Sequence, residues 1–304
     1  MQQAYHVPVL LNEVIDALQI IPSGIYVDCT FGGGGHSKKI LEKLKADGRL
    51  IVFDQDEDAR RNLPNDERVT FIPHNFRHLK RFLRLHKIDK VNGILADLGV
   101  SSHQINIAER GFSTRFDADM DMRMNRNDRK TAADIVANYS EEQLHKIFEQ
   151  FGEVTNSKTL AKCIVEARKT LNLSTINGFK NAVAPVVKGN PEKYFAQVFQ
   201  ALRIEVNEEL NVLKELLVQS LEVLAEGGRI AVITFHSLED RLVKNFFKNG
   251  NFESEPSKDL FGKPVKSELK VITKKPIIPS TEEQKRNPRS RSSKLRVAEK
   301  LKVS

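Results

Sequence analysis

A glycine run and an acid at the end of a predicted strand have the types and spacing to bind a nucleotide-like cofactor. Four glycines at 32–35 follow an apolar strand that ends in Asp28, and a helical pattern starts at Ser37. Backbone without side chains beside a helix N-terminus lets a ligand approach closely and meet N–H groups. Asp54 ends the next apolar run, twenty residues after Gly34, a spacing suited to a carboxylate on ribose hydroxyls. Together these features predict an adenosine-containing cofactor.

The glycine run also favours one class of cofactor. The dinucleotide fingerprint G-x-G-x-x-G/A aligns best as Gly32-x-Gly34-x-x-Ser37 and misses its last position, which disfavours an oxidoreductase. The looser D-x-G-x-G of S-adenosylmethionine enzymes fits better, with Thr30 where the first glycine often stands. A flexible glycine-rich loop without a ligand is disfavoured, because strand, turn, helix and second acid occur in order. The expected cofactor is S-adenosyl-L-methionine.

Asp97 is the candidate catalytic residue. It lies near the end of a predicted strand, Gly93 to Leu98, and a glycine turn follows it at once. An acid at this edge of an open α/β sheet points into the ligand crevice. Methyl transfer to an exocyclic amine depends mainly on positioning, with oxygen acceptors that hold the N–H groups. Asp97, Ser101 and Ser102 could supply them. The alternative is an aspartate that caps its own turn.

Other reactive side chains are weaker candidates. Cys29 lies beside Asp28, which should raise the thiol pKa and disfavours covalent catalysis by cysteine. His236 could be a base, a phosphate contact or a structural histidine, and the last is the commonest role for a single histidine. His74 and His78 are four apart but have no third ligand nearby, so no metal site is expected.

The elements that must position these residues predict an interrupted α/β sheet. Apolar runs alternate with helical patterns, as in parallel sheets. The expected strands are Ile25 to Thr30, Leu50 to Asp54, Val69 to Pro73, Gly93 to Leu98, Arg229 to Phe235, and two further strands that could form an antiparallel edge, Leu269 to Pro276 and Lys294 to Glu299. Residues 132–225 are almost entirely helical in pattern, with helix starts at Ser140 and Ser174. The predicted organisation is a discontinuous Rossmann-like domain, 1–108 and 213–304, with an inserted helical domain at 109–212 for substrate recognition.

Two polar segments of the expected insertion carry side chains that could meet substrate. Residues 109–113 and 119–124 mix acids, arginines and methionines in a loop that looks too polar for a core. Gln200, Arg203 and Asn207 have helical spacing, so they could form one polar face toward substrate.

Composition limits the class of protein. The chain has 304 residues, 40% of them apolar, and only two cysteines without metal-ligand spacing, which argues for a reducing compartment. Neither a signal peptide nor an apolar run of membrane-spanning length is evident, so a cytoplasmic protein without a membrane partner is expected.

Charge is concentrated near the C-terminus. Lys285 to Lys302 contain eight basic residues against one acid, Glu299, within a chain whose net charge is +8. Such a patch is typical of a nucleic-acid binder, although basic tails are also common as solvated extensions. The alternating pattern at 293–299 favours an ordered basic surface.

Several motifs taken together resemble the bacterial 16S ribosomal RNA cytosine-N4 methyltransferases, the RsmH or MraW family. They span the chain from His6 to the basic segment and are specific in combination: His6-x-Pro-Val-Leu-Leu11, Asp28-x-Thr-Phe-Gly-Gly-x-Gly-His-Ser37, Asp97-Leu-Gly-Val-Ser-Ser102, Glu109-Arg-Gly-Phe-Ser113, Asp121-Met-Arg-Met124, Phe199-Gln-Ala-Leu-Arg-Ile204, Phe235-His-Ser-Leu-Glu-Asp-Arg241 and Asn287-Pro-Arg-x-Arg-Ser-Ser293.

The resemblance implies an S-adenosylmethionine-dependent enzyme that methylates N4 of one cytidine in the decoding region of the small ribosomal subunit. By matching position it also implies the cofactor contacts, with Asp54 on the ribose, Phe76 by the adenine, and Asp97 and Gln104 near the reacting methyl; the remaining contacts are Gly34, Gly35 and His36. The partner would be 16S ribosomal RNA or the small subunit, and either a monomer or a homodimer is compatible with the sequence.

The chain departs from the family pattern at three places in or near the insertion, Ala118 to Met120, Val154 and Gln197. Two alternatives stay open. One is an amino methyltransferase acting on DNA, although Leu98-Gly-Val100 lacks the Pro-Pro-aromatic run usual in those enzymes. The other is a non-catalytic ribosome-assembly factor that retains the fold.

Overall fold

The computed structural model describes residues 8–302, and the chain forms two compact units. The first combines the chain up to Gly99 with the chain from Asn211 onward, and the second runs from Val100 to Leu210. The second unit thus begins nine residues before the expected boundary at 109 and ends two residues before the one at 212. His6 of the first motif lies outside the described residues.

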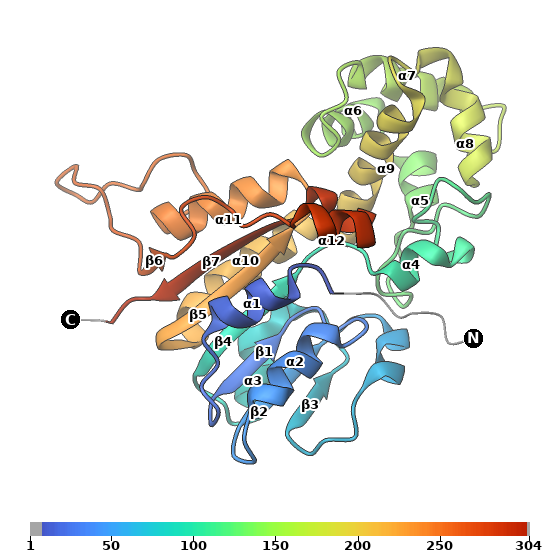
Figure 1. The fold of residues 1–304 in the computed structure, drawn as a ribbon. Helices are drawn as coiled ribbons and strands as arrows, with labels where there is room; N and C mark the ends of the chain where they lie inside the picture. The colour runs from blue at the N-terminus through green and yellow to red at the C-terminus, as the bar shows by residue number, and fades with distance from the viewer. Residues whose placement is uncertain (1–7, 303–304) are drawn as a thin grey trace. The chain divides into compact units, whose positions relative to one another are not determined.

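The first unit is built on a seven-stranded sheet in the order β3-β2-β1-β4-β5-β7-β6 (Figure 1). Its described strands are β1 Ile25–Asp28, β2 Arg49–Phe53, β3 Val69–Ile72, β4 Val91–Asp97, β5 Leu224–Thr234, β6 Leu269–Val271 and β7 Lys294–Lys300. The first five pair in parallel, and β7 is antiparallel to both of its neighbours. The chain order reverses between β1 and β4, so the carboxyl ends of these two strands border the crevice where such sheets bind ligands. The expected Rossmann-like α/β fold is confirmed.

Alternation along the strands divides the apolar side chains between the two faces of the sheet. In β2, Leu50 and Val52 join one core cluster, whereas Ile51 and Phe53 join the other. Helices α1 (Leu11–Leu18) and α2 (Gly35–Lys43) contribute to the first cluster; α3 (Leu79–Leu85), α10 (Glu209–Val223) and α11 (Ser237–Asn249) contribute to the second. Both faces are therefore covered, as parallel sheets require. A short helix, α12 (Thr281–Arg286), precedes β7.

The second unit is helical and has its own apolar core, which α5, α6, α7, α8 and α9 supply. Its described α-helices are α4 Ser102–Asn106, α5 Ala132–Asn138, α6 Glu141–Gln150, α7 Ser157–Ala167, α8 Ile176–Val183 and α9 Pro191–Asn207. Ser140 caps α6 through a capping box with Gln143, as the sequence predicted. The prediction that Ser174 starts a helix was wrong by one residue, since Thr175 accepts the N-terminal hydrogen bond of α8.

The last two strands pair antiparallel and together form one edge of the sheet, as predicted, with β6 outermost. One expectation about these strands needs correction. The strand expected to run from Leu269 to Pro276 ends at Val271. Among the described residues, no helix combines the length and apolar character needed to cross a bilayer.

Candidate cofactor and active site

The site begins at Asp28, which ends β1 and organises the turn that follows. One carboxylate oxygen accepts a hydrogen bond from the Thr30 N–H at 3.0 Å, and the other accepts from the Ser37 hydroxyl at 2.7 Å. Ser37 lies in the first turn of α2, so a single buried carboxylate ties the strand end to the helix. Burial raises the pKa of Asp28. Asp28 thus supports the turn.

The glycine turn between β1 and α2 has a backbone conformation that other residues rarely adopt. Gly32 and Gly34 have φ angles of 49° and 73°, in the left-handed region, and Gly34 is the N-cap residue of α2. A Cβ atom added to Gly32 would meet no atom closer than 3.9 Å, so the space beside this backbone is open. The turn is fixed from outside, because Asn62 donates to the Gly32 carbonyl at 2.8 Å. It is thus an ordered, accessible stretch of backbone at a helix N-terminus.

Asp54 follows β2 and is tied to the same turn. One of its oxygens accepts from the Gly32 N–H at 2.7 Å, and the other accepts from the Asp56 N–H at 2.8 Å. Burial nevertheless raises its pKa to about 6, against the effect of these hydrogen bonds. Each oxygen retains a second lone pair, so the carboxylate can still accept ribose hydroxyls. That role stays a prediction.

Asp97 and His36 face each other across the strand ends. His36 is buried in the first turn of α2, where its Nε2 lies 2.9 Å from the Val9 carbonyl and its Nδ1 lies 3.8 Å from one oxygen of Asp97. Burial lowers the pKa of His36 to about 4, so the ring is neutral at neutral pH. Because only a protonated Nε2 can bond the Val9 carbonyl, Nδ1 is the unprotonated nitrogen. Two acceptors therefore face each other at a distance too long for a hydrogen bond.

The Asp97 carboxylate makes no hydrogen bond to any described residue. Its other oxygen is buried and has no partner, although its backbone N–H donates to the Thr30 hydroxyl at 2.7 Å. Burial, with the negative charges of Asp28 and Glu239, raises its pKa well above the ordinary value. A buried polar atom without a partner is costly and rare in folded proteins. The Asp97 carboxylate can therefore accept a hydrogen bond from a ligand. Because it accepts none from the backbone of the following turn, the alternative that Asp97 caps its own turn is excluded.

Phe76 and Gln104 lie on separate short helices. Phe76 begins a 3-10 turn, Phe76–His78, and packs half-buried at the margin of one core cluster. Gln104 belongs to α4 in the second unit, where its amide oxygen accepts from the Ser101 N–H at 3.0 Å within a capping box. The pattern Ser101-x-x-Gln104 is the sequence signal for this cap. Contact of either residue with a cofactor stays a prediction.

His236 has the structural role that the sequence analysis considered commonest. It is the N-cap residue of α11, and its Nδ1 accepts from the Glu239 N–H at 3.5 Å. The Glu239 carboxylate in turn accepts from the Phe235 N–H at 2.8 Å. Cys29 is also inert: burial, followed by the charge of Asp28, raises its pKa well above the ordinary thiol value, as predicted.

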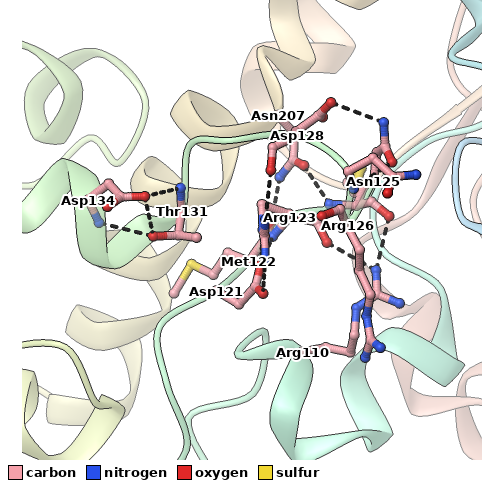
Figure 2. A network of polar contacts seen from close by, with 12 residues as sticks. Arg110, Asp121, Met122, Arg123, Asn125, Arg126, Asp128, Thr131, Asp134 and Asn207 are labelled. Carbon is pink, nitrogen blue, oxygen red and sulfur yellow. Dashed lines mark hydrogen bonds and ion pairs between the residues drawn. The ribbon is translucent and has the colours of Figure 1, made fainter.

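The two polar motifs of the second unit form part of its interior, contrary to the prediction that they were too polar for a core. Arg110 is completely buried and donates to the carbonyls of Arg123 and Met124, each at 3.0 Å. Asn207 bonds the same loop, accepting from the Met124 N–H at 2.7 Å and donating to the Met122 carbonyl at 2.8 Å (Figure 2). Met122 itself is buried. These motifs therefore stabilise the conformation of a loop within the unit.

The predicted polar face of α9 is likewise used inside the unit. Gln200 donates to the Phe151 carbonyl at 2.9 Å, and Arg203 pairs with Glu209 at 2.8 Å. Since Asn207 bonds the loop, all three residues have internal partners. Contact of this face with substrate stays a prediction.

The C-terminal basic segment is ordered, as predicted, but only part of it is surface. Arg296 is buried and forms a two-pronged ion pair with Asp240, at 2.6 and 3.1 Å. Lys300 is also buried and pairs with Glu268. The exposed cations of this segment are Lys285, Arg286, Arg291 and Lys302. The exposed cations lie outside β7, whereas Arg296 and Lys300 belong to β7, which is a mostly buried strand between β5 and β6.

Comparison with known proteins agrees with the motifs. A curated protein of Parabacteroides distasonis, named ribosomal RNA small subunit methyltransferase H, is 54% identical over 299 residues and covers 98% of both chains. A protein of the same name from Flavobacterium psychrophilum is 55% identical over 292 residues, covering 96% of this chain and 100% of the relative.

Solved structures are more distant. An rRNA methylase from Streptococcus thermophilus has a TM-score of 0.44 and 11% identity, covering 98% of this chain and 99% of its own. A putative rRNA methylase from Clostridium thermocellum has the same TM-score at 12% identity, covering 97% and 100%. The family comparison is decisive, because a model of the MraW methylase family matches residues 3–301. The chain belongs to the MraW methylase family.

Proposed function

We propose that this protein is an S-adenosyl-L-methionine-dependent methyltransferase that modifies the exocyclic N4 amine of a cytidine in the decoding region of small-subunit ribosomal RNA. The observation that carries the proposal is the half-buried Asp97 carboxylate, which has one buried oxygen without a partner and an acceptor nitrogen of His36 opposite the other oxygen. The names of the relatives support ribosomal RNA of the small subunit as substrate. The choice of cytidine N4 rests on the motif resemblance.

The residues present fit the cofactor. When bound, S-adenosylmethionine supplies an electrophilic methyl group on a sulfonium sulfur. The turn offers open backbone at Gly32, just before the N-terminus of α2, and Asp54 holds a carboxylate with spare lone pairs beside that glycine. We assign Asp54 to the ribose hydroxyls and Phe76 to the adenine. Gly34, Gly35, His36 and Gln104 complete the proposed contacts.

Asp97 holds and orients the amine. A cytosine amine is a weak nucleophile because its lone pair is conjugated with the ring, so the protein must fix its N–H groups and direct nitrogen at the methyl. The Asp97 carboxylate accepts one N–H in a buried setting, where such a bond is strong. In exchange for the methyl group, which would leave the sulfonium sulfur, the amine would release one proton, and Asp97 would accept it. The raised pKa of Asp97 suits that role.

RNA recognition needs cationic surface and an accessible base. The target base must leave its stack before an enzyme can act on its amine. Exposed arginines are available in the second unit at 115, 126 and 129, and in the C-terminal segment at 286 and 291. We assign the second unit to substrate recognition. A ribosomal substrate places the enzyme in the cytoplasm.

Methyl transfer to isolated small subunits tests the proposal. Labelled S-adenosylmethionine is incubated with small ribosomal subunits from cells that lack this gene, and the labelled nucleoside is identified by mass. We expect N4-methylcytidine at one decoding-region position, with Asp97→Asn as the inactive control. Label on DNA but not on subunits would favour the DNA alternative. Absence of cofactor binding by the wild type would favour a non-catalytic assembly factor.

A further inference from the structure

A hairpin between α11 and β6 exposes two large apolar side chains at its tip. Leu260 is fully exposed and Phe261 is 86% exposed, the two most exposed large apolar residues described. Figure 1 shows this segment extending away from the sheet beyond the end of α11. The hairpin follows Asn249, the last residue of α11, whereas the first residue of α11 lies beside the carboxyl ends of the strands. The length of α11, about 20 Å, therefore separates the hairpin from the candidate site. Neither the cofactor nor the reaction accounts for these side chains.

The tip of the hairpin is a built turn. Its two sides pair through an antiparallel bridge between Lys258 and Pro264. The Asp259 carboxylate accepts from the N–H groups of Phe261 and Lys263 at 2.8 and 2.9 Å. The Asp259 N–H donates to the Lys263 carbonyl at 2.8 Å, and the Gly262 N–H returns to the Asp259 carbonyl at 3.0 Å. The backbone therefore presents Phe261 in an ordered conformation, which lowers the entropic cost of binding.

The charge around the tip is positive. Residues 258–275 contain six lysines and two acids, and all six lysines are exposed. Both acids are engaged, Asp259 by the backbone of the turn and Glu268 by Lys300. An apolar tip alone would suit a protein groove. An aromatic ring beside a row of lysines suits a polyanion with flat bases, because stacking and phosphate contacts act together in such binding.

We propose that the 257–266 hairpin is a second RNA contact of this enzyme, in which Phe261 stacks on an unpaired base and Lys258, Lys263 and Lys266 bind the adjacent phosphates. The inference rests on the proposed function, since the RNA it would contact is the ribosomal substrate. It adds a recognition element outside the catalytic unit's crevice. It also explains why an exposed phenylalanine is held in a hydrogen-bonded turn.

Fluorescence offers a direct test, because the chain contains no tryptophan. Phe261→Trp places the only indole at the hairpin tip, and Leu85→Trp places it at another exposed apolar position, 66% exposed at the end of α3. Each variant is titrated with a single-stranded RNA oligonucleotide. We expect saturable quenching for Phe261→Trp and little change for Leu85→Trp. Equal responses from the two variants would overturn the stacking contact.

The effect on the reaction is measured with small ribosomal subunits as substrate. Phe261→Ala should raise KM for subunits by about tenfold, the loss expected for one stacked base, and leave kcat unchanged. Replacing the three lysines together with alanine should lower the salt slope of RNA binding by about 2. If wild type methylates subunits but both variants match it, the hairpin inference is wrong and the proposed function stands. If wild type itself fails to methylate subunits, the proposed function falls first.

A protein contact or self-association is the competing explanation for the tip. If Phe261→Ala leaves RNA oligonucleotide affinity unchanged but alters the sedimentation of the protein alone, the tip binds a second copy and the RNA inference is refuted. Phe261→Ala could instead impair methylation of assembled subunits but leave binding and methylation of protein-free 16S ribosomal RNA unchanged. The tip would then contact a ribosomal protein, and the RNA inference would again be refuted.

Discussion

Replacing Asp97 with asparagine should separate stability from activity. The substitution keeps the shape of the side chain and removes its charge. The carboxylate accepts no hydrogen bond from any described residue, so none is lost, and the repulsion from Asp28 and Glu239 disappears. We therefore expect the free energy of unfolding to stay the same or to increase. Turnover should fall by about 10²–10³-fold, as when one preorganised electrostatic contact to a transition state is removed.

Asp240→Asn is the matched control in the same unit. Its carboxylate pairs with the buried guanidinium of Arg296, which would lose its counter-charge. Breaking a buried ion pair from one side costs about 3–5 kcal/mol. The same chemical change is thus predicted to be harmless at Asp97 and severe at Asp240. The contrast depends only on what each carboxylate contacts.

Thermal unfolding and methyl transfer measure the two effects together. A loss of 1 kcal/mol would lower Tm by about 2 °C or more in a chain of this size, which is readily detected. A clear fall in Tm for Asp97→Asn, with activity reduced in proportion to unfolded protein, would show that Asp97 is structural. Near-normal turnover by a stable Asp97→Asn variant would remove Asp97 from the mechanism.

Three further predictions concern pH and RNA. The pKa of His36, about 4, lies below the ordinary histidine value of 6.5. The free energy of unfolding should therefore fall by about 3 kcal/mol as pH decreases from 6.5 through 4. His36→Gln should remove this decrease when the two proteins are compared by chemical denaturation. The pKa of Asp54, about 6, predicts that affinity for S-adenosylhomocysteine rises as pH increases through 6, because only the ionised carboxylate accepts hydrogen bonds from both ribose hydroxyls. Calorimetry should show an affinity that does not depend on pH for Asp54→Asn. A pH-independent affinity of the wild type would contradict the assignment. Arg289→Ala with Arg291→Ala should weaken RNA binding and flatten its salt dependence, and an unchanged salt slope would leave this segment without an RNA role.

Much of the fold could be predicted from the sequence because its elements are local. Apolar runs of strand length followed by helical patterns indicated the parallel strands, and the reversal of order between β1 and β4 follows the usual topology of such sheets. The positions of the glycine turn and of Asp28, Asp54 and Asp97 follow from the ends of the strands. Carboxyl ends of parallel strands meet at one edge, so these acids come together in any sheet of this order.

The accessibility and partners of charged side chains could not be predicted in the same way. The eight cations near the C-terminus form one run in the sequence, yet β7 turns Arg296 inward to Asp240 and Lys300 inward to Glu268. Arg110 resembled a substrate contact and is instead buried under the loop it supports.

The sequence by itself determined the family, the order of secondary structure elements and the residues at the strand ends, because these depend on short-range patterns. Tertiary structure alone decided that the Asp97 carboxylate has no hydrogen-bond partner among the described residues, whereas Asp240, the same type of side chain, is neutralised by Arg296. The physical reason is that the state of a buried charge depends on groups far away in the sequence, which only the folded chain brings within contact distance.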